Sequence, residues 1–87
     1  MEIKYSDRAV KQIKKIHKGN PKIAEIIFSM VEAYAKNPLG KFDMKILKGK
    51  YGNLKRLRVG DYRVIFEYEE KNLLIYEIKH RQEAYHD

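Results

Sequence analysis

The chain has 87 residues, a net charge of +7 and no cysteine, and 44% of its residues are hydrophobic. This size predicts one domain over residues 1–87, and the apolar content argues against disorder. The lack of cysteine excludes disulfides and thiolate metal sites, and no apolar run is long enough to cross a membrane. The first residues lack the apolar core of a signal peptide, so we expect a cytoplasmic protein without membrane contact.

The positive charge is concentrated in one segment. Residues 45–63 contain seven Lys or Arg and one acidic residue, Asp61, whereas residues 64–87 are net negative. Such a concentration creates a local positive field. It favours polyanionic partners: nucleic acid, the ribosome surface or an acidic protein.

The first half of the chain predicts a strand and two helices. Alternating polarity at residues 2–6 indicates a short strand, and Ser6 or Asp7 is suited to cap the helix that follows. Residues 19–21, Gly-Asn-Pro, end that helix and begin a second one, which ends before Pro38. The second helix has a broad apolar stripe, formed by Ile23, Ile26, Ile27, Met30, Val31 and Tyr34.

From residue 45 onward the apolar period changes to two, which is typical of strands. We expect strands at about 45–48, 54–59, 62–68 and 73–79. The order β-α-α-β-β-β predicts an α+β fold with a mostly antiparallel, four-stranded sheet region. Both helices are expected on one face of the sheet, which leaves the other face at least partly open to a ligand.

Gly60-Asp61 predicts a two-residue hairpin turn of type I′ or II′. This turn places Arg58 opposite Arg63, with Arg56 on the same face, although like charges at cross-strand distance are destabilising. An anion that normally lies there would explain the arrangement, because arginine donates two parallel hydrogen bonds to phosphate. The opposite face is predicted to be core: Leu57, Val59, Tyr62, Val64 and Phe66.

The last strand is placed by its apolar residues. Leu74, Tyr76 and Ile78 are expected to face the core, which requires a three-residue loop at 70–72 with Asn72 in the left-handed conformation. Arg63 then lies opposite Lys79. A loop of even length would instead turn His80 to the open face.

With this register the open face carries five cations: Arg56, Arg58, Arg63, Lys79 and Arg81. No paired carboxylates, metal-ligand spacing or glycine-rich phosphate loop accompany them, so we expect neither metal nor cofactor. Cleavage of RNA through its own 2′-hydroxyl needs only proton transfer and stabilisation of the phosphate. A lysine among arginines is a candidate base because neighbouring positive charge favours its neutral form, and Tyr85 is a candidate for stacking on a base.

Two segments, residues 57–66 and residues 78–85, resemble the RelE/ParE toxin superfamily through the arginine hairpin and the Tyr85 ending. The segment Leu47-Lys48-Gly49 and the helical hairpin fit as well. The resemblance implies a toxin whose partner is an acidic, RelB-like antitoxin. RelE members enter the ribosomal A site and cut messenger RNA without a metal, so the ribosome and messenger RNA are also implied partners.

The resemblance also implies residue roles. Arg63 matches the phosphate-binding arginine of the family, and Lys79 and Arg81 match its second basic cluster. Tyr85 matches the C-terminal tyrosine, and Arg56 lies on the basic preceding strand. These five are the predicted catalytic residues, and further RNA contacts are predicted at Lys48, Lys55, Arg58 and His80. Which of Lys55, Arg56 and Lys79 is the general base stays open.

Several alternatives remain at the level of the sequence. The fold resemblance permits a ParE-like, non-enzymatic inhibitor of DNA gyrase equally, whereas the arginine face and the ending from Lys79 to Tyr85 favour RNA cutting. A basic RNA-binding module or an inactive relative is a weaker alternative. Arg63 is alternatively paired with Glu67 or Glu77, and Arg56 and Arg58 are alternatively ordinary solvated residues. His80 is either a structural hydrogen-bonding residue or a candidate acid, and Tyr85 alternatively packs on the sheet edge.

Overall fold

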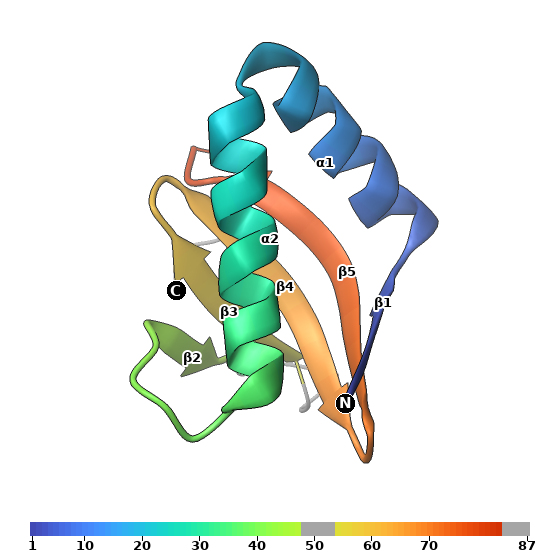
Figure 1. The fold of residues 1–87 in the computed structure, drawn as a ribbon, viewed down its shortest axis with the longest axis vertical. Helices are drawn as coiled ribbons and strands as arrows, with labels where there is room; N and C mark the ends of the chain where they lie inside the picture. The colour runs from blue at the N-terminus through green and yellow to red at the C-terminus, as the bar shows by residue number, and fades with distance from the viewer. Residues whose placement is uncertain (48–53, 83–87) are drawn as a thin grey trace.

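The computed structural model describes residues 1–47 and 54–82, and it confirms the predicted α+β class. Five strands form one sheet in the order β1-β5-β4-β3-β2. Both helices lie on the same side of this sheet, with α2 crossing in front of β3 and β4 in Figure 1. The elements are β1 (Glu2–Tyr5), α1 (Asp7–Gly19), α2 (Pro21–Lys36), β2 (Met44–Ile46), β3 (Leu54–Val59), β4 (Tyr62–Glu69) and β5 (Asn72–His80).

Side-chain caps fix the ends of the helical hairpin as the sequence predicts. The Ser6 hydroxyl accepts a hydrogen bond from the Ala9 amide at 3.0 Å, which satisfies a free donor of the first turn of α1. The Asn20 side chain does the same for the Ile23 amide at 3.2 Å. Asn20 also ends α1 through its own amide, so one residue closes one helix and opens the next.

The core lies between the helices and one face of the sheet. The helices contribute Ala9, Ile13, Ala24, Ile27, Val31 and Tyr34, and the sheet contributes Leu57, Val59, Val64, Phe66, Leu73, Ile75 and Ile78. Tyr62 packs against this core, as predicted, but Ile26 does not and is 42% exposed. Within the described part of the chain no helix is long and apolar enough to span a membrane.

The first strand joins the sheet, which therefore has one strand more than the predicted four-stranded region. β1 pairs with β5 in parallel, with Glu2 opposite Asn72 and Tyr5 opposite Ile75. The Ser6 hydroxyl also donates to the Tyr76 carbonyl oxygen at 2.7 Å. The start of the chain is therefore held against its last strand.

The predicted register of β5 is right near Lys79 and wrong near Tyr76. Arg63 pairs with Lys79 and Val64 with Ile78, but Phe66 pairs with Ile75. A β-bulge at this point leaves Tyr76 as an extra residue, which reverses the alternation of faces. Leu73 and Ile75 are therefore buried in place of Leu74 and Tyr76.

The bulge also explains why the loop prediction failed. The β4–β5 turn has two residues and not three, because Glu69 already pairs with Asn72. Glu70, and not Asn72, has the positive φ, at 47°. The turn has one residue fewer than predicted, and the bulge adds one residue to β5. The two changes in register cancel, so Arg63 pairs with Lys79 as predicted.

Candidate functional site

The β3–β4 turn brings the arginines of the hairpin together. Gly60 has a φ of 59° and Asp61 has no positive φ, the pattern of a type II′ turn. Arg58 pairs directly with Arg63, as the sequence predicts. Both guanidinium groups donate to the Gly60 carbonyl oxygen, each at 3.4 Å. Two positive charges therefore converge on one backbone oxygen.

Arg56 and Arg58 share a carboxylate. Asp43, which precedes β2, lies 3.1 Å from Arg56 and 3.9 Å from Arg58. The Arg56 side chain is only 11% exposed, whereas that of Arg58 is 49% exposed. Arg56 is thus held firmly at the floor of the face, and Arg58 reaches toward solvent.

Arg63 and Lys79 lie side by side at the centre of this cluster. The Lys79 ammonium is 3.6 Å from Glu77, which also receives Arg8 at 3.4 Å. Arg63 donates to the carbonyl oxygens of Gly60 and Tyr62, both at 3.4 Å. Across residues 1–47 and 54–82, no carboxylate lies within ion-pair distance of Arg63, so the alternative pairing with Glu67 or Glu77 is not observed.

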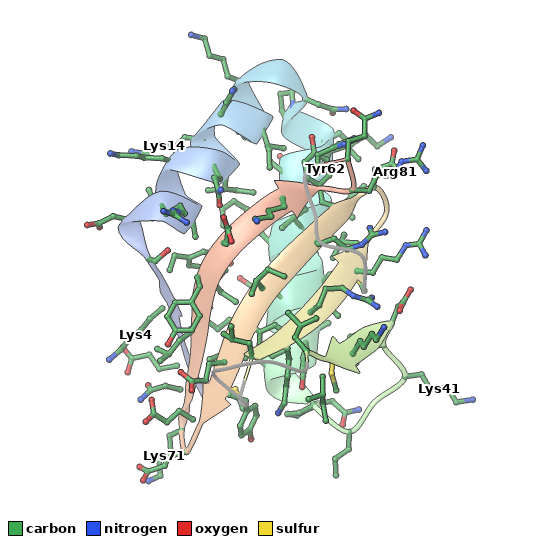
Figure 2. The ribbon with its side chains drawn as sticks, turned by 180° about the vertical axis from the view of Figure 1, so that it is seen from behind. Lys4, Lys14, Lys41, Tyr62, Lys71 and Arg81 are labelled. Carbon is green, nitrogen blue, oxygen red and sulfur yellow. The ribbon has the colours of Figure 1, made fainter. Side chains whose placement is uncertain are left out.

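Arg81 completes the group from the end of β5. Its amide donates to the Asp61 carbonyl oxygen at 2.7 Å, and its Nε lies 3.8 Å from the Asp61 carboxylate. Figure 2, which views the sheet from the side opposite α2, shows Arg81 at the same end as Tyr62. We call Arg56, Arg58, Arg63, Lys79 and Arg81 the basic cluster.

The basic cluster has more cations than carboxylate partners in the described part of the chain. Within residues 1–47 and 54–82, its five cations contact three carboxylates, those of Asp43, Asp61 and Glu77. No helix crosses this face of the sheet in Figure 2. Among the five, Arg63 has no carboxylate partner among the described residues, which makes it the best candidate to bind a large anion.

Two predicted RNA contacts lie on the helix side of the sheet. Lys55 pairs with the buried Phe66, and its ammonium lies 5.3 Å from the centre of the Tyr68 ring. His80 pairs with Tyr62 and forms an edge-to-face ring contact with it at 5.2 Å. The structure does not bring these two side chains together with the basic cluster. Lys48 and Tyr85 lie outside the described residues, so their predicted roles stay predictions.

The sequence analysis missed a pair of carboxylates on the open face. Glu67 and Glu77 line one hollow of about 420 Å³ together with Leu54, Ile65 and Tyr76. The Tyr76 hydroxyl donates to Glu67 at 2.6 Å, and this hydrogen bond, with burial and nearby carboxylates, raises the pKa of Tyr76 to about 12. The bulge brings Tyr76 to this face, and no sequence signal marked the bulge.

The arrangement of the acidic side chains also bears on metal binding. Among the residues that the structure describes, no group of three or more His, Asp or Glu side chains is arranged to hold a metal ion. Of the acidic residues on the open face, Asp43, Asp61 and Glu77 contact cations, and Glu67 accepts a hydrogen bond from a hydroxyl group.

Nearly the whole chain matches a known family. The model of the ParE toxin of type II toxin–antitoxin systems, parDE, matches residues 3–85. The chain belongs to this family. It is a toxin of a type II toxin–antitoxin system, and the predicted RelE/ParE superfamily is confirmed. Comparison with curated proteins gives no significant match.

Solved structures share the fold of this ParE-family toxin. A YoeB/ParE toxin from Agrobacterium tumefaciens has a TM-score of 0.80 at 12% identity, covering 92% of this chain and 98% of that chain. The YoeB dimer from Staphylococcus aureus has a TM-score of 0.79 at 17% identity, with 92% and 95% covered. An archaeal RelE–RelB complex from Pyrococcus horikoshii has a TM-score of 0.70 at 28% identity, with 95% and 97% covered.

Proposed function

We propose that this toxin is an endoribonuclease that cuts messenger RNA on the ribosome, with the basic cluster holding the scissile phosphate. The observation that carries the proposal is Arg63, whose guanidinium contacts only backbone carbonyl oxygens among residues 1–47 and 54–82, and which lies directly opposite Lys79 on the sheet face away from the helices. Arginine forks bind phosphate through paired hydrogen bonds, and Lys79 adds a point charge beside it.

The proposed reaction uses the nucleophile of the substrate. The 2′-oxygen attacks the neighbouring phosphorus, the bond to the 5′-oxygen breaks, and the products are a 2′,3′-cyclic phosphate and a 5′-hydroxyl. The proton of the 2′-hydroxyl goes to a base, and the leaving 5′-oxygen receives one. Arg63 and Lys79 stabilise the extra negative charge of the crowded phosphate, a contribution that needs no metal or cofactor.

The positive charge of the chain also indicates which partners it binds. The net charge of +7 suits both ribosomal RNA and an acidic antitoxin. The archaeal relative was solved as a RelE–RelB complex, and another structural neighbour as a YoeB–YefM complex. We therefore infer an acidic antitoxin as partner of the single toxin domain, and a cytoplasmic location where messenger RNA and ribosomes meet.

Substitution of Arg63 tests the proposal. Arg63→Ala should abolish growth arrest and the new 5′ ends that primer extension detects on translated messages, with circular dichroism unchanged. Lys41→Ala is the matched control, because this exposed lysine lies in the loop before β2 and outside the basic cluster. Full cleavage by Arg63→Ala would refute the role of Arg63.

The second candidate is an inhibitor of DNA gyrase, which the match to the ParE family favours. Purified toxin would then block supercoiling by gyrase and leave messages on programmed ribosomes intact. The two assays together decide between the candidates, because each function predicts a positive result in only one of them.

A further inference from the structure

The hollow beside the basic cluster has the composition of a nucleobase site. Its floor and walls are apolar or aromatic, with Leu54 from β3, Ile65 from β4 and Tyr76 from the β5 bulge. Glu67 and Glu77 add two carboxylates to the lining. Bases taken from single-stranded RNA stack on such surfaces while their edges form hydrogen bonds.

The hollow adjoins the proposed phosphate site directly. Ile65 follows Arg63 by two residues on the same face of β4, a separation of about 7 Å along a strand. Glu77 precedes Lys79 by two residues and is joined to it by the 3.6 Å ion pair. A nucleotide whose phosphate lies between Arg63 and Lys79 therefore has its base within reach of the hollow.

The carboxylates decide what the hollow accepts. They repel phosphate, so the backbone of the RNA is kept on the basic cluster. Carboxylates only accept hydrogen bonds, and they pair with the amino groups of bases. The hydroxyl of Tyr76 holds Glu67 at 2.6 Å and uses one of the acceptor positions of that carboxylate, which leaves others for a ligand.

We propose that this hollow is a base-selecting subsite that favours adenine, cytosine and guanine, which carry amino groups, over uracil, whose single N3–H donor lies between two carbonyl oxygens that a carboxylate repels. The proposal rests on the proposed function for its phosphate site. Glu67 is its specificity-determining residue, and Tyr76 is a positioning residue that orients Glu67.

Binding of the four nucleoside 3′-monophosphates tests the subsite without requiring cleavage. Followed by methyl shifts of Leu54 and Ile65, the wild-type protein should bind the AMP, CMP and GMP isomers about fivefold more tightly than the UMP isomer, the lower end of discrimination by one base contact. Glu67→Gln should remove this difference, because an amide both donates and accepts. Tyr76→Phe should reduce it. Glu25→Gln on the exposed face of α2 is the matched control.

The outcomes separate this inference from the proposed function. Equal binding of all four nucleotides by the wild-type protein, or an unchanged preference in Glu67→Gln, overturns the subsite and leaves the nuclease proposal standing. Selective binding without cleavage of translated messages supports the subsite and refutes the nuclease. Binding of none of the four overturns both. Where messages are cut, the cleavage sites should be depleted in uracil at one position, and Glu67→Gln should lose that depletion.

Discussion

Two arginines of the β3–β4 hairpin are held in different ways. Arg56 is almost buried and is fixed by the Asp43 carboxylate at 3.1 Å. Within the part of the chain that the structure describes, Arg63 is held only by carbonyl oxygens at 3.4 Å, a length at which hydrogen bonds are weak. An anion would gain little from Arg56 without competing with Asp43, whereas the donors of Arg63 are available at low cost. This difference makes Arg63 the first residue to test.

The shared carboxylate of Asp43 should limit RNA affinity. Asp43→Asn removes the negative charge that Asp43 places beside Arg56 and Arg58, so more of their positive charge attracts phosphate. We expect tighter binding of a single-stranded oligoribonucleotide in fluorescence anisotropy, with a steeper loss of affinity as salt increases. The free energy of unfolding should change by less than about 1 kcal/mol, because Asp43 is mostly exposed.

A control with the same change in charge isolates this effect. Glu69→Gln lies at the far end of β4, away from the basic cluster, and should leave the affinity nearly unchanged. Weaker binding by Asp43→Asn would show that Asp43 serves mainly to orient the two arginines.

The hydrogen bond between Tyr76 and Glu67 predicts an alkaline titration. Because folding raises the pKa of Tyr76 from 10.0 to about 12, its contribution to stability is complete below pH 10 and is lost as the pH rises through 12. Near-ultraviolet tyrosinate absorbance should show a tyrosine that titrates late. Glu67→Gln should move that titration back toward pH 10, since the carboxylate is its largest cause.

Tyr5 provides an internal reference for this experiment. Its pKa is also raised to about 12, first by burial and then by Glu32, neither of which depends on Glu67. Glu67→Gln should therefore leave the late titration of Tyr5 in place, and Tyr5→Phe should remove it. Tyr34, whose pKa burial also raises, should be unaffected by either change. A late titration of Tyr76 that persists unchanged in Glu67→Gln would contradict the observed contact.

Among the elements, the β3–β4 hairpin was predictable and the β4–β5 hairpin only in part. Gly60-Asp61 is a local signal that fixes turn length, and turn length fixes the register of Arg58 and Arg63. In β5 the sequence Leu73-Leu74-Ile75-Tyr76 has apolar residues on both faces, so either alternation was compatible with a core. Only packing against the helices selects Leu73 and Ile75, and this is a tertiary effect.

Alanine substitutions at Gly60 and at Gly19 should change the stability of the protein in opposite directions. A Cβ at Gly60 meets no atom within 4 Å, but φ there is +59°, so Gly60→Ala should destabilise the fold by about 1–2 kcal/mol through backbone strain alone. Gly19 also has open space and lies in the last turn of α1, without a positive φ. Gly19→Ala should stabilise the protein by about 0.4–1 kcal/mol.

Thermal or urea unfolding of the two variants measures both effects. Because the added methyl group is the same and is free of steric contact at both positions, the opposite signs isolate backbone conformation as the cause. Equal shifts in the two variants would contradict the type II′ turn at Gly60.

For the molecule as a whole, the two-layer architecture and the basic cluster were predictable from the sequence. The hollow on the same face of the sheet was not. The change of apolar period separates helices from strands, and the arginine register gave the basic cluster. The hollow of Glu67, Tyr76 and Glu77 depends on the bulge, which no residue type announces. Lys55 was predicted as an RNA contact from the family resemblance, and His80 from its place next to Lys79 and Arg81. Alternation along the strands places both side chains on the helix side of the sheet.

The pairing of β1 with β5 has a consequence for synthesis of the toxin. β1 leaves the ribosome before its hydrogen-bonding partner, which follows it by seventy residues, as Glu2 opposite Asn72 shows. Lys79 and Arg81 arrive with that same strand. A nascent chain thus lacks both its finished sheet and two of the five cations of the basic cluster until β5 and Arg81 have been made. If the toxin acts as proposed, its phosphate site would be completed only after this strand has joined the sheet.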